Sequence, residues 1–195
     1  MSEVKILIEG YAKPTGGETF KASPSTVLIK DSGKLILVDP GTSKQKLTNS
    51  LKLEGVRLSD IDLIFLTHYH IDHLLNIKLF PDTDVCDGWT LYRDDEEMEI
   101  SNKIPGTNVL IIPTPGHANE HVSLLVKTKT GKICVAGDLW WWQDGAEPKL
   151  DRKSLLSLKD PFAKDKKALL ASRKKIFKLA DYIIPGHGRI FKLAK

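Results

Sequence analysis

Short runs of apolar residues recur along the chain, and polar turns separate them. Each run is rich in branched and aromatic side chains and is too short for a typical helix, so it predicts a buried strand. The tripeptides Asp31-Ser32-Gly33 and Lys129-Thr130-Gly131 predict hairpin turns between neighbouring strands. The predicted strands are residues 4–11, 26–30, 35–39, 61–67, 109–112, 122–127, 133–137 and 182–184.

Two other segments place apolar residues at helical spacing. Residues 72–80 carry leucines on one side, and residues 161–180 predict a longer helix whose inward side includes Leu169, Ser172 and Ile176. Strands and helices in this arrangement are typical of α/β proteins. With 195 residues and 41% hydrophobic content, the chain suffices for a single domain over residues 1–195, and no Pro-, Gly- or Ser-rich linker divides it.

The net charge of +4 is unevenly distributed, because basic residues gather on the longer predicted helix, 161–180. A basic helix face suits RNA or another phosphate-bearing partner. The alternative is a solvated face without a partner, which is common for runs of like charge. The residues concerned are Lys164, Lys166, Lys167, Arg173, Lys174, Lys175 and Lys178.

Neither export nor membrane insertion is indicated. Glu3, Lys5 and Glu9 interrupt the first ten residues, so these lack the apolar core of a signal peptide, and no apolar run reaches about 18 residues. Cys86 and Cys134 lie far apart and predict reduced thiols. We therefore expect a cytoplasmic protein with no membrane partner.

The densest group of candidate metal ligands follows the predicted strand 61–67. His68, His70, Asp72 and His73 lie almost side by side, although the chain has only 6 histidines. Imidazole and carboxylate are the groups that hold zinc and similar ions. A solvated polar turn is the alternative, but chance places this combination in on the order of one in a few thousand such chains. Because ligands usually bind at the carboxyl ends of strands in layered α/β proteins, this segment predicts a metal site.

Three further strand ends carry one candidate ligand each. Apolar runs lead into Pro115-Gly116-His117, Gly137-Asp138 and Pro185-Gly186-His187. Glycine allows the backbone conformations that such a turn needs. Each residue alone is as readily an ordinary turn residue. Together with the first cluster, His117, Asp138 and His187 complete a set of candidates large enough for two metal ions.

The order of these motifs, from Thr67 to His187, resembles that of the metallo-β-lactamase superfamily. The similarity extends over nearly the whole chain and is greatest to small single-domain members of the type called metallo-β-lactamase domain-containing protein one. It implies a four-layer αβ/βα sandwich in which helices flank two mixed sheets. It also implies that His68, His70 and His117 bind a first metal ion, that Asp72, His73 and His187 bind a second, and that Asp138 bridges both.

The resemblance further implies two divalent metal ions, with zinc expected and iron or manganese as the alternatives. Asp39 is followed by Pro40, where the family more often has a threonine. That position usually supports the metal loop from behind, so the ligand set is intact. We expect a metal-bridging hydroxide to attack the substrate, and Asp72 to orient it and to accept its proton.

A phosphodiester such as RNA is the first substrate class that we expect, because of Asp138 and the basic helix. The alternative is hydrolysis of a carboxylic ester, lactone, thioester or β-lactam bond by the same centre. His70 stands where oxygen-reducing diiron relatives show a glutamate, which favours hydrolysis, although iron-dependent persulfide oxidation keeps the histidine. A non-catalytic metal-binding module is an alternative of a different class.

Aromatic residues near the ligands are candidates for a substrate pocket. In an extended segment, alternation places Trp140 and Trp142 on one side and Trp141 on the other. We expect Trp140 and Trp142 to line the pocket together with Tyr69, which lies between two ligands; contact in a homodimer is the alternative for an exposed tryptophan. His121 matches no ligand role and is expected behind the ligands or at the surface.

Overall fold

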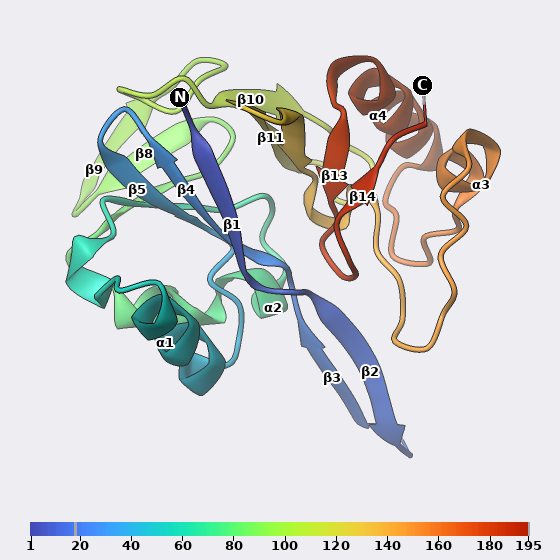
Figure 1. The fold of residues 1–195 in the computed structure, drawn as a ribbon, viewed down its shortest axis with the longest axis horizontal. Coiled ribbons are helices and arrows are strands. Elements are labelled where there is room, and N and C mark those ends of the chain that lie inside the picture. The colour runs from blue at the N-terminus through green and yellow to red at the C-terminus, as the bar shows by residue number, and fades with distance from the viewer. Residues whose placement is uncertain (18, 195) are drawn as a thin grey trace.

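The computed structural model describes residues 1–17 and 19–194, whose strands form two main sheets (Figure 1). Both sheets are mixed, because β5, β6 and β7 run parallel, as do β12 and β13, while the other neighbours are antiparallel. The first sheet has the order β1 (Glu3–Ile8), β4 (Thr26–Asp31), β5 (Lys34–Val38), β6 (Leu63–Phe65), β7 (Asp84–Cys86), β8 (Thr90–Arg93) and β9 (Glu96–Glu99). The second has the order β10 (Leu110–Pro113), β11 (Val122–Thr128), β12 (Gly131–Val135), β13 (Tyr182–Ile184) and β14 (Phe191–Lys192).

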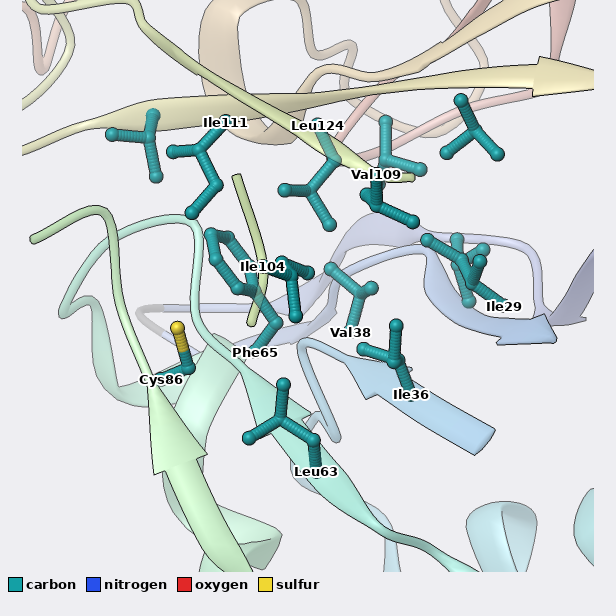
Figure 2. Packing of buried hydrophobic residues seen from close by; sticks show 14 of the residues in the cluster. Ile29, Ile36, Val38, Leu63, Phe65, Cys86, Ile104, Val109, Ile111 and Leu124 are labelled. Carbon is teal, nitrogen blue, oxygen red and sulfur yellow. The ribbon is translucent and has the colours of Figure 1, made fainter. Parts of the chain in front are cut away.

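The main apolar core lies between the two sheets (Figure 2). Ile36, Val38 and Phe65 of the first sheet face Ile111 and Leu124 of the second. Because successive side chains of a strand point to opposite faces, the intervening residues of the same strands build further apolar clusters on the outer faces. The short apolar runs of the sequence are therefore strands that are buried on both sides.

Helices cover the outer face of each sheet. On the first sheet, α1 (Lys44–Leu53) packs through Leu47 and Leu51. On the second sheet, α3 (Arg152–Ser157) and α4 (Lys166–Leu179) pack through Leu155 and Ile176. The layers run helix, sheet, sheet, helix, which confirms the predicted four-layer αβ/βα sandwich. No helix in residues 1–17 and 19–194 is long and apolar enough to span a membrane.

Both predicted helices differ from the structure at their bounds. The helix predicted over 161–180 begins at Lys166, because the Asp165 carboxylate accepts hydrogen bonds from the first backbone N–H groups and caps the helix. The segment 72–80 contains only one α-helical turn, α2 (Ile71–Leu74), followed by the 3-10 helix η2 (Leu75–Leu79). The α-helical hydrogen bonds do not continue through this segment, because the His73 carbonyl accepts from the Gly41 N–H.

The basic face predicted for 161–180 is mostly exposed, as expected. The prediction was wrong for Arg173, which does not lie on this exposed face. Its side chain is buried on the inward side of α4, next to Ser172 and Ile176. The lysines of this segment are exposed. Helical spacing places position 173 beside the apolar stripe, and the long arginine side chain finds carbonyl partners there.

The strand predicted over 4–11 is two strands. It breaks after β1, and β2 (Tyr11–Gly16) pairs with β3 (Thr19–Ser23) in a hairpin that projects from the sandwich (Figure 1). Gly10 lies at the bend, where a Cβ atom would be only 2.1 Å from the Gly186 carbonyl oxygen. Sequence reasoning missed this hairpin, the strands β7 to β9 and β14, and helices α1 and α3. The hairpin and β9 are largely polar and exposed, so neither shows a buried face in the sequence pattern.

Cys86 and Cys134 are free and buried, in agreement with the prediction of unpaired thiols. Both predicted hairpin turns are also confirmed. Ser32 and Gly33 join β4 to β5 with positive φ values of 51° and 82°, a conformation that short hairpin turns require. The remaining short elements are the 3-10 helices η1 (Leu58–Asp60) and η3 (Gly137–Leu139).

Candidate metal centre

Four strand ends from the two sheets converge on one site. The segment after β6 brings His68, His70, Asp72 and His73, and the ends of β10, β12 and β13 bring one residue each. The seven predicted ligands form two groups, and within each group the candidate ligand atoms all lie within 4.8 Å of one another. The groups are His68, His70, His117 and Asp138, and Asp72, His73 and His187.

Asp138 lies between the two groups, and its two carboxylate oxygens divide between them. Oδ2 lies 3.3 Å from His117 Nε2 and 3.9 Å from His68 Nε2. Oδ1 lies 3.3 Å from His73 Nε2 and 3.6 Å from His187 Nε2. One carboxylate thus offers an oxygen to each group, as the bridging role implied by the resemblance requires.

The outer members of each group complete the arrangement. In the first, His70 Nδ1 lies 3.1 Å from His117 Nε2. In the second, Asp72 Oδ2 lies 3.3 Å from His187 Nε2 and 3.9 Å from His73 Nε2. Nitrogen and oxygen atoms that share so small a space need a cation between them, or a proton, to be stable together.

Several of these atoms are buried without a hydrogen-bond partner among the described residues. They are His68 Nε2, His73 Nε2 and Asp138 Oδ1. Buried polar atoms are normally paired, and an exception points to a missing ion or water molecule. Because the three belong to the two ligand groups, the donor set of this chain fits two metal ions.

Each buried histidine is held through its other ring nitrogen. His117 Nδ1 lies 2.7 Å from Asp160 Oδ2, and His73 Nδ1 lies 2.8 Å from Asp39 Oδ2. His187 Nδ1 donates to the backbone carbonyls of Tyr11 and Ser23, at 3.0 Å each, and His68 Nδ1 lies 3.0 Å from the Thr67 hydroxyl. With acceptors at Nδ1, the proton stays there and Nε2 is free for a metal.

Asp39 supports the whole ligand loop. Its Oδ1 accepts from the Thr67 backbone N–H at 2.9 Å, and its Oδ2 accepts from the Thr67 hydroxyl at 2.8 Å as well as facing His73. Burial lowers the pKa of His73, but the carboxylates of Asp39 and Asp138 outweigh it and hold the pKa well above 6.5. The same carboxylates favour a metal cation in place of that proton.

Asp160 is a residue of the candidate site that sequence reasoning missed. It is 6% exposed, its Oδ2 holds His117, and its Oδ1 accepts from the Phe162 N–H at 3.0 Å and from Trp141 Nε1 at 3.3 Å. It follows no strand and lies 43 residues from His117 in the sequence. The one available signal was an acidic residue before a proline in a lysine-rich stretch.

His121 lies behind the first ligand group and belongs to neither group. Its ring centroid is 5.1 Å from that of His68, and its Nδ1 is 3.0 Å from the Thr114 hydroxyl. Burial lowers the pKa of His121 to about 3, so its ring is neutral. This position agrees with the prediction that it lies behind the ligands.

Five of the candidate ligands, His70, Asp72, His117, Asp138 and His187, line the base of a cleft of about 720 Å³. Its walls come from the β2–β3 hairpin, the segment after β12 and the loop before α4. The described residues that line it include four large apolar side chains but no Lys or Arg: Ala12, Phe20, Ala22, Thr42, His70, Ile71, Asp72, His117, Asp138, Trp141, Gln143, Pro161, Phe162 and His187.

The prediction for the aromatic wall was wrong. Trp140 is fully buried in the outer core of the second sheet, where its ring contacts Phe177 and its Nε1 donates to the Leu155 carbonyl. Trp142 packs on Phe191 outside the cleft, and Trp141 lines the cleft instead. Alternation did place Trp140 and Trp142 on one side, but that side faces the core.

Tyr69 is also absent from the described lining of the cleft. Its hydroxyl donates to Asp87, and burial together with this hydrogen bond raises the pKa of Tyr69. The side chain points from the ligand loop towards β7 and β8, because Asp87 joins these strands. Tyr69 therefore anchors the loop rather than lining the pocket.

Known proteins share both the sequence pattern and the fold. Residues 21–101 match the family model of the metallo-beta-lactamase superfamily. Metallo-beta-lactamase domain-containing protein 1 of Xenopus laevis is 33% identical over 201 residues, which cover 98% of this chain and 82% of that protein.

Two solved structures show the breadth of this fold. AidC, a dizinc quorum-quenching lactonase, has a TM-score of 0.63 at 17% identity, over 91% of this chain and 77% of that one. TTHA1623 in a di-iron-bound form has a TM-score of 0.60 at 20% identity, over 92% and 93%. The probable metallo-hydrolase MJ0296 of Methanocaldococcus jannaschii is 31% identical over 97% of this chain and 89% of that protein. With these relatives and its cluster of His and Asp side chains, the chain belongs to the metallo-β-lactamase superfamily and is a metal-dependent hydrolase.

Proposed function

We propose that this protein is a two-metal hydrolase that cleaves an ester-type bond at the base of the cleft. The observation that carries the proposal is the division of Asp138, whose two carboxylate oxygens face different ligand groups. The two ligand groups would hold two divalent ions, which would supply a water molecule of lowered pKa and polarise the bond to be cleaved, so no Ser or Cys nucleophile would be needed. Zinc suits this imidazole-rich set, and iron or manganese are the alternatives.

We assign proton transfer to Asp72. It lines the cleft, and its side chain is 28% exposed, whereas that of Asp138 is 7% exposed. Burial raises the pKa of Asp72, but the hydrogen bond with His187 contributes to a net shift below the usual value. Asp72 is thus a carboxylate at neutral pH. Because it lines the cleft, it can accept a proton from a water molecule that binds there.

A phosphodiester such as RNA is the first substrate class that we propose. The two ligand groups would suit displacement at phosphorus, since a metal ion in each would stabilise the attacking and the leaving oxygen. Phe20, Trp141 and Phe162 offer aromatic surface in the cleft on which a base can stack. Lys164 is exposed, and its backbone N–H bonds to the His117 carbonyl, so the basic segment begins beside the metal centre.

A carboxylic ester, lactone, thioester or β-lactam is the second candidate, and the composition of the cleft favours it. The described residues that line the cleft include no Lys or Arg, whereas nucleic-acid grooves are typically basic. Ile71 and the aromatic side chains instead suit a neutral substrate with an apolar group next to the scissile bond.

Turnover by the metal-loaded protein separates these classes. The panel contains bis(p-nitrophenyl) phosphate, a short single-stranded RNA, a lactone, a thioester and nitrocefin. Asp138→Ala should abolish all turnover, and Trp141→Ala should raise KM for the true class. Trp89→Ala is the matched control, because Trp89 is exposed outside the cleft. Cleavage of the phosphate substrates supports the first class, and cleavage of carbonyl substrates alone supports the second.

Metal content of the untreated protein tests the premise. Two zinc ions per chain, measured by mass spectrometry, support the hydrolase. One iron and no zinc would overturn it in favour of persulfide oxidation. Full metal content without turnover of any substrate, together with binding of a macromolecule, would instead support a non-catalytic module.

A further inference from the structure

Arg173 is a buried cation on the inward side of α4. It is 2% exposed. Its Nε donates to the Leu139 carbonyl at 2.8 Å, and its Nη1 donates to the Leu158 carbonyl at 2.6 Å. Its Nη2 has no hydrogen-bond partner among the described residues. The guanidinium therefore holds two backbone segments at once.

One segment carries a residue of the first ligand group, and the other carries the residue that holds His117. Leu139 directly follows Asp138, and Leu158 lies two residues before Asp160, which holds His117. His117 Nε2 and Asp138 Oδ2 lie only 3.3 Å apart, so the relative position of these segments sets the spacing between two candidate ligand atoms.

A second contact from the same turn of α4 reaches the segment that carries His117. The Ser172 hydroxyl donates to the Pro115 carbonyl at 2.8 Å, two residues before His117. Gly116 lies against α4 so closely that a Cβ there would be 2.2 Å from the Leu169 nitrogen. The helix thus supports the segments that carry His117 and Asp138, two members of the first ligand group.

The chemistry of Arg173 suits positioning better than stability. Burial lowers its pKa to about 10, although the nearby Asp160 carboxylate opposes the shift. A buried cation without a direct carboxylate partner is costly, and an apolar side chain of similar volume is often neutral or stabilising in its place. What an apolar side chain or a lysine cannot do is present a rigid planar fork to two carbonyls.

We propose that Arg173 is a positioning residue for the first metal ion, acting through the Asp138 and Asp160 segments. Among the described residues, this guanidinium makes no hydrogen bond to the second ligand group, Asp72, His73 and His187. That group is held by Asp39 and the β2–β3 hairpin instead. Because Asp138 Oδ1 also faces the second group, a smaller loss is expected there, and the larger effect of Arg173 falls on the first metal equivalent. This inference rests on the two-metal centre proposed above.

Metal titration against a chromophoric chelator, combined with thermal unfolding of the metal-free protein, tests the proposal. For Arg173→Met we expect one metal equivalent to bind about 10- to 100-fold more weakly, as for other residues that support metal ligands. The second equivalent, which shares only Asp138 with this segment, should lose clearly less affinity, and the metal-free protein should unfold no earlier. Lys174→Met, at an exposed neighbouring position, is the matched control.

Arg173→Lys keeps the charge and decides the case if Arg173→Met does not fold. It should also weaken one equivalent, by about 10-fold, because one ammonium cannot span both carbonyls. Unchanged affinity for both equivalents overturns the proposal. So does an equal loss at both sites with a lower unfolding temperature, which indicates a purely structural role. Wild-type protein that binds two ions but hydrolyses nothing refutes the proposed function and leaves this inference standing.

Discussion

Replacing Asp160 by Asn tests how the first ligand group is held. All three donors around this carboxylate are N–H groups: His117 Nδ1 on Oδ2, and Phe162 N and Trp141 Nε1 on Oδ1. An asparagine offers one oxygen and one NH2 group, so its NH2 group must face one of these N–H donors. Only the imidazole can adapt, because it can move its proton from Nδ1 to Nε2.

The expected result follows from that proton. In Asp160→Asn the amide NH2 donates to His117 Nδ1, and the proton then sits on Nε2, the atom that faces Asp138. A protonated Nε2 cannot bind a metal ion, so the variant must give up either this tautomer or the ligand. Loss of such a supporting residue typically weakens metal binding by about 10- to 100-fold. This corresponds to about 1.4 to 2.7 kcal/mol.

The assay is a chelator competition that resolves the two metal equivalents. Asp84→Asn is the matched control, since Asp84 makes an ion pair with Arg93 on the first sheet. We expect Asp160→Asn to weaken one equivalent and the control to weaken neither. Wild-type binding of both ions by Asp160→Asn would refute the reasoning about the tautomer, and an equal loss of both would show that Asp160 acts on the fold rather than on His117.

Other variants test the site and the core. Gly186→Ala would place a Cβ 1.8 Å from Asp138 Oδ1 and should reduce the metal content measured by mass spectrometry; wild-type content would contradict this close approach. Trp140→Ala should lower the free energy of unfolding by about 3 to 5 kcal/mol in urea denaturation, whereas Trp141→Ala at the cleft wall should cost clearly less, and equal losses would contradict their different burial. Burial raises the pKa of Asp31, but the hydrogen bonds that it accepts hold the pKa below 3.8. Its stabilising effect is therefore present above that pH and lost as the pH falls through the folded-state pKa. Asp31→Asn should thus have a lower free energy of unfolding than the wild type at pH 7, and the two values should converge in acid. A difference that persists at low pH would argue against this.

The candidate ligands were predictable because each one lies in the segment that follows a buried strand. The apolar run fixes where a strand ends, and the parallel arrangement brings such ends to one edge of the sandwich. Local sequence patterns alone thus predicted that four side chains are neighbours: His68, His117, Asp138 and His187. The structure brings them together in the two predicted groups. Their role as metal ligands is a prediction that the metal titrations test.

The supporting residues were not predictable in the same way. Asp160 and Arg173 have no local pattern, because a buried polar side chain is defined by partners far away in the sequence. The prediction of which tryptophans line the cleft was wrong for a related reason. Alternation shows that Trp140 and Trp142 share a side, but α3 and α4, which cover the second sheet, decide that this side is core.

The sequence by itself determined the layered α/β fold, the strand ends and the identity of the seven candidate ligands. These features depend on residues close together in the chain, where hydrophobic period and turn chemistry act directly. Only the tertiary structure decided which oxygen of Asp138 faces which group, that Trp141 lines the cleft, and that Arg173 is buried beneath the site. These depend on how separate elements pack, and the free energy of packing is set by the whole core rather than by any one segment.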